Sequence, residues 1–230
     1  MRSGSDERRT GTLDRGDAVD ADALARPSPE TMLVEIGTEL DGPVSAFGAA
    51  FWRLLAEKAP AMALRVAAKT ELRELHYSDR YLVAPLPVRL ALAVATSAPG
   101  FAKNTKLLLD VSTAVSDSRS GTPFRIQHNW GVDHHARDVI DAMARRASPL
   151  ALVRRRDKGA MPHGRSLVLH YADRSVRIIL DQGFGFWETA KPVGFDFTQS
   201  PQNQTEDLAT KDFHVKAKSS GKYWGVVAPG

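Results

Sequence analysis

The sequence contains no cysteine among its 230 residues, which excludes disulfides, thiolate-bound zinc and a thiol nucleophile. It has no run of about 18 apolar residues, and its N-terminus lacks the apolar stretch of a secretory signal. It also lacks HExxH, a glycine-rich phosphate loop, a GxSxG elbow and a kinase signature. We therefore expect a cytoplasmic protein with no membrane span, no metal and no cofactor.

The charge balance leans only slightly to the basic side. Lysine and arginine number 31 against 27 aspartate and glutamate residues, a formal net charge of +4, and the sequence pI is about 9.4. This bias favours anionic partners without identifying one. Residues 1–30 are charged and rich in small residues, with too few apolar groups to offset the entropy of ordering. We predict a disordered tail over 1–30 and a single domain over 31–230.

Apolar periodicity, interrupted by proline and glycine, predicts alternating strands and helices after the tail. Gly42-Pro43 is expected to open the first helix, and Pro85 and Pro87 to end the strand region before the second. We expect strands at 32–36, 68–77, 106–115, 166–171, 175–180, 213–215 and 223–227, helices at 42–60, 88–98 and 134–147, a polar loop at 117–122 and a helical turn at 205–209. This order predicts an α/β (α+β) fold, with a mixed sheet flanked by helices.

The sharpest local motif is His76-Tyr77-Ser78-Asp79-Arg80, at the end of a predicted strand. In open α/β sheets, ligand sites gather at the carboxyl ends of strands. The guanidinium fork of Arg80 suits phosphate, so Arg80 and Asp79 are predicted phosphate-site residues. The alternative is that the two cap the following helix or pair with each other.

A second motif precedes the predicted hairpin, where His163 and Arg165 are two residues apart. On a strand, this spacing places both side chains on one face, where they could grip an oxyanion. The alternative is an ordinary surface pair. In the segment Asp181 to Trp187, glycines let the backbone approach another group closely. Its aromatic side chains are interpreted as core residues in preference to base-stacking ones.

Arginine runs supply a third feature. Arg145-Arg146 and Arg154-Arg155-Arg156 are predicted to follow a phosphate backbone, and the alternative is a solvated surface. Three histidines, His128, His134 and His135, lie near Asp133, but no ligand-spaced pair is present on one helix face. We interpret them as a cluster at a helix entry.

The C-terminal half resembles the phospholipase D-like domain found at the C-terminus of MIT-domain proteins, over about residues 160–215. The resemblance rests on Pro162 to Leu167, Ile178 to Trp187 and Phe195 to Phe197. That family has a His-Asp-Arg motif entering a hairpin. Here His163 and Arg165 occupy its ends, and Gly164 replaces the Asp. The chain also resembles segments that accompany bacterial helicases in phage-defence systems, which implies a helicase partner.

Phospholipase D enzymes use a His-x-Lys motif in each half. Ser78 follows His76 by two residues and Arg165 follows His163 by two, so neither half carries the lysine. The resemblance therefore implies a phosphate-binding fold that is not catalytic. In the MIT-associated relatives, this domain binds acidic phospholipid surfaces.

The leading interpretation is a non-catalytic phosphate- or nucleic-acid-binding module. It would serve as an accessory subunit, with DNA and a helicase as partners, in a bacterial DNA-transaction or phage-defence assembly. One alternative is a metal-independent phosphodiesterase or nuclease with His76 and His163 as catalytic residues. Another is a subunit that mainly docks a larger protein.

Overall fold

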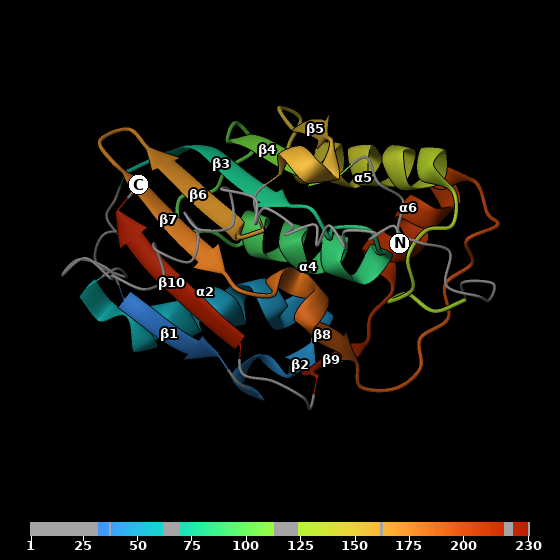
Figure 1. Ribbon diagram of the computed structural model, residues 1–230, viewed down its shortest axis with the longest axis horizontal. Coiled ribbons are helices and arrows are strands. Elements are labelled where there is room, and N and C mark those ends of the chain that lie inside the picture. The colour runs from blue at the N-terminus through green and yellow to red at the C-terminus, as the bar shows by residue number, and fades with distance from the viewer. Residues whose placement is uncertain are drawn as a thin grey trace, which may run out of the picture.

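The structure, a computed structural model, describes residues 32–36, 38–61, 70–112, 124–161, 163–218 and 223–229 (Figure 1). The predicted tail over 1–30 and the predicted polar loop over 117–122 lie outside these residues.

In the described part of the chain, ten strands form two sheets. The strands are β1 Met32–Ile36, β2 Gly42–Pro43, β3 Leu72–Asp79, β4 Lys106–Ser112, β5 Leu152–Arg156, β6 Arg165–Tyr171, β7 Ser175–Leu180, β8 Trp187–Thr189, β9 His214–Ala217 and β10 Tyr223–Pro229. The large sheet has the order β1-β10-β7-β6-β3-β4-β5, and β2, β9 and β8 form a small antiparallel sheet. Strands β3, β4 and β5 run parallel, and the other pairs of the large sheet are antiparallel.

Four helices of the described residues accompany the mixed sheet, which confirms the predicted α/β architecture. They are α2 Phe47–Lys58, α4 Pro85–Thr96, α5 Asp133–Ala147 and α6 Pro201–Thr210, with short 3-10 turns at η1 Thr38–Leu40, η2 Val44–Ala46, η3 Lys158–Ala160 and η4 Gly183–Phe186. In Figure 1, α2 and α4 lie near the middle of the molecule, while α5 lies beside β5 at the sheet edge. No helix of the described residues has the length and apolar character needed to span a bilayer.

Aromatic side chains from distant segments fill the core beneath the sheet. Phe47 of α2 meets Trp187 edge to face, with ring centroids 5.0 Å apart, and Tyr77 of β3 meets Phe184 at 5.4 Å. Phe184 and Trp187 are completely or almost completely buried. Each such ring removes about 150–250 Å² from water, so this cluster is a main source of stability. The interpretation of the 181–187 aromatics as core residues is confirmed.

Two proline predictions were wrong in their details. The second helix begins at Pro85, three residues before the predicted start, and Pro85 and Pro87 both lie in its first turn. Proline is tolerated there because the first amides of a helix have no intrahelical partner. Gly42-Pro43 does not open α2 but forms β2, which pairs with β9, and Pro43 then caps the 3-10 turn η2.

Strands β5 and β8 were not predicted from the sequence, and helix α6 is longer than predicted. The segment Leu152–Arg156 is a strand, although its three arginines were predicted only as a basic run. The predicted helical turn at 205–209 is part of α6, which starts at Pro201 behind the N-cap Ser200. The Ser200 hydroxyl accepts a hydrogen bond from the Asn203 amide at 3.3 Å, the capping arrangement that fixes such a helix start.

Candidate functional site

Strand β3 brings the first predicted motif to the middle of the large sheet. Alternation places Leu75, Tyr77 and Asp79 on the face that packs against the core, and His76 and Ser78 on the opposite face. We call this opposite side the polar face. The motif therefore divides between two environments, one at the strand end and one on the polar face.

The first environment is a group of cations around one phenol ring, which we call the Tyr81 cluster: Arg80, Tyr81, Lys158, His163 and Arg165. The guanidinium carbons of Arg80 and Arg165 lie 5.1 and 4.7 Å from the centre of the Tyr81 ring. The Lys158 ammonium lies 5.4 Å from the same centre. Arg80 contacts both ring nitrogens of His163, at 2.6 Å for Nε2, and donates to the Tyr81 hydroxyl at 3.0 Å.

The carboxylate of Asp79 lies directly beneath this cluster. It is 2% exposed, and it accepts hydrogen bonds from the Tyr77 hydroxyl and the Tyr81 amide, each at 2.8 Å. Its ion pair with Arg165 is long, at 3.8 Å. Burial raises the pKa of Asp79 above its usual value, even though the hydrogen bonds from Tyr81 and Tyr77 and the arginine charges oppose this. Asp79 therefore holds the Tyr81 backbone amide in place and forms an ion pair with Arg165.

The Tyr81 cluster carries more positive charge than its surroundings balance. Arg80, Arg165 and Lys158 lie around the Tyr81 ring, and Arg165 forms an ion pair with the buried carboxylate of Asp79. The Nε atoms of Arg80 and Arg165 are buried and have no hydrogen-bond partner among the described residues. Arg80 as a whole residue is 8% exposed. The hydrogen bond from Arg80, together with the charges of all three cations, lowers the pKa of the Tyr81 phenol. The arrangement suits an anion with several acceptor oxygens.

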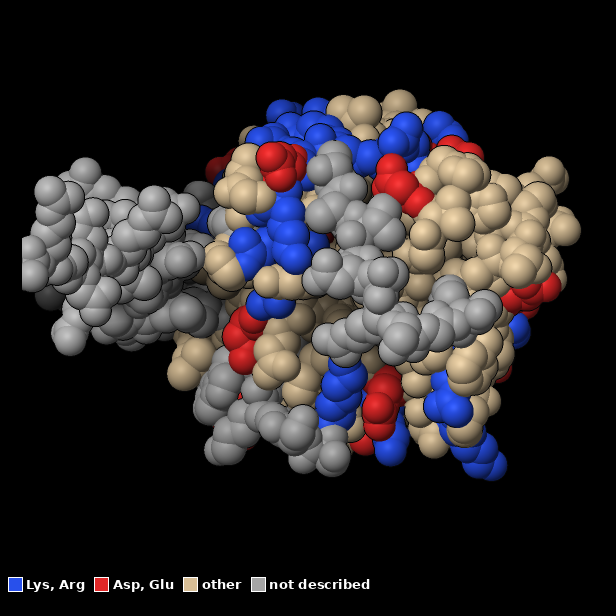
Figure 2. All heavy atoms as spheres, turned by 45° about the vertical axis from the view of Figure 1, so that its right-hand side comes forward, with Lys and Arg blue, Asp and Glu red and all other residues tan. Residues whose placement is uncertain are grey.

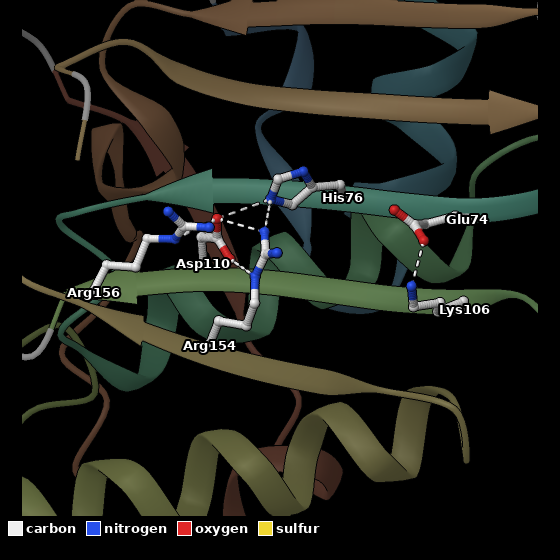
Figure 3. Close-up of polar contacts among 6 residues, drawn as sticks. All are labelled: Glu74, His76, Lys106, Asp110, Arg154 and Arg156. Atoms are coloured by element: carbon white, nitrogen blue, oxygen red, sulfur yellow. Dashed lines mark hydrogen bonds and ion pairs between the residues drawn. The ribbon is translucent and has the colours of Figure 1, made fainter. Parts of the chain in front are cut away.

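The second environment lies on the polar face and centres on Asp110 (Figure 3). Arg154 grips this carboxylate with two hydrogen bonds, at 2.5 Å from Nε and 2.8 Å from a terminal nitrogen. Arg156 Nε and His76 Nε2 approach the same carboxylate at 3.1 and 3.2 Å. We call these four residues, on strands β3, β4 and β5, the Asp110 cluster.

Electrostatics in the Asp110 cluster are opposite to those of Asp79. Burial alone would raise the pKa of Asp110, but the Arg154 hydrogen bonds and the charges of His76 and both arginines leave it lowered. Burial lowers the pKa of His76, although the charge and hydrogen bond of Asp110 oppose this effect. A separate pair, Glu74 and Lys106, lies further along the same face at 2.7 Å (Figure 3).

The structure brings Arg80 together with His163 and Arg165. Arg80 and His163 are in contact although they lie 83 residues apart in the sequence. The structure places His76 elsewhere, on Asp110. Asp173 and Arg174, which repeat the Asp-Arg pair of the first motif, lie in the turn between β6 and β7. The two motifs therefore meet through the contacts of Arg80 with His163 and of Arg165 with Asp79, while His76 lies against Asp110 instead.

The arginine runs separate into groups. Arg154 and Arg156 lie on the polar face, whereas Arg155 points to α5, where it is bonded to Asp141 and the Arg137 carbonyl. On α5, Arg146 is paired with Glu206 at 2.7 Å, and Arg145 is exposed. Figure 2 shows lysine and arginine side chains gathering along the upper part of the molecule, at the height where Figure 1 places β5 and α5.

Sequence reasoning missed Asp110 and did not assign roles to Tyr81 and Lys158. Asp110 stands in the apolar strand Leu107-Leu108-Leu109-Asp110-Val111, and an aspartate is rarely buried unless it is paired. That rule could have indicated a cationic partner on a neighbouring strand. Nothing in the sequence indicates that Lys158 would reach the Tyr81 ring.

Comparison with known proteins identifies the family. The family model for the C-terminal domain of the DEAD/DEAH box helicase YjiV matches residues 30–227, so the chain belongs to this family. No protein with a curated description matches the chain. Among solved structures, polyphosphate kinase from Porphyromonas gingivalis aligns with a TM-score of 0.38 and 11% identity, covering 90% of this chain and 26% of that one. The chain thus spans about a quarter of that kinase, and a likeness at this level does not establish a common fold.

Proposed function

We propose that this member of the YjiV C-terminal domain family is a helicase-associated accessory module that binds the phosphate backbone of nucleic acid without cleaving it. One observation carries the proposal. Three cations surround the Tyr81 ring, and the buried carboxylate of Asp79 lies beside them in an ion pair with Arg165. A phosphodiester oxygen would accept hydrogen bonds from the guanidinium and ammonium groups of this cluster and balance their positive charge.

Binding is favoured over cleavage because of how the two histidines are engaged. A covalent route by two histidines needs both imidazoles at one phosphorus atom. His163 is bonded to Arg80 in the Tyr81 cluster, and His76 is bonded to Asp110 in the other. Neither has a lysine two residues after it. The phosphodiesterase interpretation remains a prediction, and metal-independent cleavage that disappears in His163→Ala would establish it in place of the binding role.

The family supports a nucleic-acid ligand and a helicase partner, because the matching model describes a helicase domain. Phosphate contacts position a protein on nucleic acid without reading its sequence, so we expect weak sequence preference. The phospholipase D-like identity of the domain belongs to the same proposal, and the two resembling stretches around His163 and Phe184 support it. The phage-defence setting stays a prediction.

The test is binding of the whole chain to fluorescently labelled single-stranded DNA, followed by anisotropy over a range of salt concentrations. We expect the logarithm of the binding constant to fall linearly with the logarithm of salt, because neutralised phosphates release counterions. Lys158→Ala should weaken binding several-fold and Arg80→Gln on the order of tenfold, as loss of a charge-assisted hydrogen bond implies.

Lys103→Ala is the matched control, because Lys103 is equally exposed but lies at the opposite end of the parallel strands, just before β4. Lys158 is a surface residue, so its variant tests the proposal even if Arg80→Gln folds poorly. Absence of binding at low salt, binding that is insensitive to salt, or equal losses in Lys158→Ala and Lys103→Ala would each refute the proposal.

A further inference from the structure

The geometry points to a second phosphate-binding position at the Asp110 cluster, and we infer that the ligand is a chain of linked phosphates that reaches from the Tyr81 cluster across the polar face to β5. This inference rests on the proposed function and specifies its ligand. It assigns Arg154 and Arg156 to one phosphate of a nucleic acid strand, and Arg80, Lys158 and Arg165 to another.

The Asp110 cluster contains more guanidinium groups than its one carboxylate needs. Two guanidinium groups share the single carboxylate of Asp110, and the His76 imidazole lies 3.2 Å from the same carboxylate. One arginine would satisfy a buried aspartate, and Arg154 alone supplies two hydrogen bonds to it. The second guanidinium, on Arg156, therefore adds an unbalanced positive charge and repels the first. An external anion would remove that repulsion.

The guanidinium groups of Arg154 and Arg156 are held by Asp110 and are partly exposed. Asp110 is 4% exposed, so it fixes the two arginines from beneath, while their side chains are 36% and 48% exposed. A guanidinium group has five N–H donors, and the Nε of Arg156 lies in an ion pair with Asp110, 3.1 Å from its Oδ2. Terminal N–H groups remain on a partly exposed face, already oriented. Preorganisation of this kind lowers the entropic cost of binding a phosphate.

The distance between the Tyr81 cluster and the Asp110 cluster follows from the strand register. Ser78 is paired in register with Asp110, and Ser112 with Arg156, so Arg80 follows β3 at the level of Arg156 on β5. Two strand spacings separate them, about 10 Å between backbones. Asp110 holds Arg156, while the Tyr81 ring and His163 hold Arg80. The two groups therefore fit separate phosphates of one strand better than they fit a single phosphate.

The experiment compares two labelled oligodeoxythymidylates, of about three and about twelve nucleotides, for binding to the full chain. Arg156→Ala should weaken binding of the longer oligonucleotide on the order of tenfold, and lower its salt slope by about 0.7, the value for one phosphate of a single strand. The short oligonucleotide, which can occupy the Tyr81 cluster alone, should lose less than about twofold. Arg156→Lys should recover part of the loss, since it restores charge without the guanidinium fork.

Arg53→Ala is the matched control, because Arg53 is a 72% exposed arginine on α2, outside both clusters. Inorganic polyphosphate as competitor separates two sources of linked phosphates: displacement at equal phosphate concentration would show that the bases contribute nothing, and weaker displacement would favour nucleic acid. Thermal unfolding of each variant checks folding, and Arg156→Ala leaves the Arg154 bonds to Asp110 in place.

Failure of this inference and failure of the proposed function give different results. If Lys158→Ala weakens binding while Arg156→Ala matches Arg53→Ala in affinity and salt slope, the second position does not exist, and the first one stands. If neither oligonucleotide binds the unmodified chain, the proposed function itself is wrong. A loss in Arg156→Ala that is equal for the short and the long oligonucleotide also overturns the inference, because one phosphate would then contact both clusters.

Discussion

Gly183 packs against Asp79, Arg165 and Tyr77, so replacing it tests the close packing next to the Tyr81 cluster. Its φ is +61°, a left-handed conformation that costs an L-residue about 1–2 kcal/mol. A Cβ atom there would lie 2.5 Å from Asp79 Oδ2, 3.1 Å from Arg165 Cγ and 3.3 Å from the Tyr77 hydroxyl. Asp79 cannot move aside freely, because it is buried and bonded to Tyr77 and Tyr81.

Gly183→Ala should therefore destabilise the protein by about 2 to 5 kcal/mol, the sum of the backbone cost and about 1–3 kcal/mol for overpacking. For a domain of this size, that lowers Tm by roughly 5–15 °C. Urea unfolding measures the change. The variant should also lose DNA affinity, because displacement of Asp79 moves Arg165.

Gly185→Ala is the control two residues away. A Cβ atom at Gly185 meets nothing within 4 Å, and its backbone is not left-handed. We expect a change within about 0.5 kcal/mol, as for most surface substitutions. Equal stabilities of the two variants would refute the close approach of Gly183 to Asp79.

Two buried carboxylates give predictions of opposite sign. Asp110 has a lowered pKa in the folded chain, so its contribution to stability is present above its unfolded pKa of about 3.9 and is lost as the pH falls through the folded value. Asp110→Asn should cost about 1.5–3 kcal/mol at pH 7, with the difference shrinking below about pH 4 in urea titrations; a difference independent of pH would contradict the reasoning. Asp79 has a raised pKa, so its protonated form stabilises the fold at low pH, and this contribution is lost as the pH rises through the folded value. Asp79→Asn should flatten the pH dependence without loss of stability at pH 7, and a large loss at pH 7 would show that the charged form is the stabilising one.

The strands and helices with strong apolar periodicity were predictable because burial dictates their pattern. The hairpin of β6 and β7 and the helix α5, with Val139, Ile140 and Met143 buried, lie where the sequence placed them. Strand β5 was not predictable in the same way. It lies at the sheet edge, where exposure permits arginines and removes the apolar signal.

The site was predictable in its residue types but not in its grouping. A run of arginines shows only that a segment is positively charged. The alternation of a strand determines which of its side chains share a face. Arg155 therefore points away from Arg154 and Arg156 and contacts Asp141 of α5. The contact of Arg80 with His163 depends on the antiparallel pairing of β3 with β6. That long-range register has no local signature in sequence.

Alternation also explains why the same residue type has opposite electrostatics on neighbouring strands. Asp110 is paired in register with Ser78, so it lies on the face that carries Arg154 and Arg156, and these arginines keep it ionised. Asp79, one residue later on β3, lies on the core side, where hydroxyl and amide donors contact it and Arg165 stays 3.8 Å away. Burial therefore dominates at Asp79, and charge pairing dominates at Asp110. Asp79 accepts hydrogen bonds from Tyr77 and Tyr81 and lies 3.8 Å from Arg165, whereas Arg154 alone supplies two hydrogen bonds to Asp110 and leaves the second arginine in excess. We therefore expect the Tyr81 cluster to bind the first phosphate more tightly, and the Asp110 cluster to determine how long a chain the site prefers.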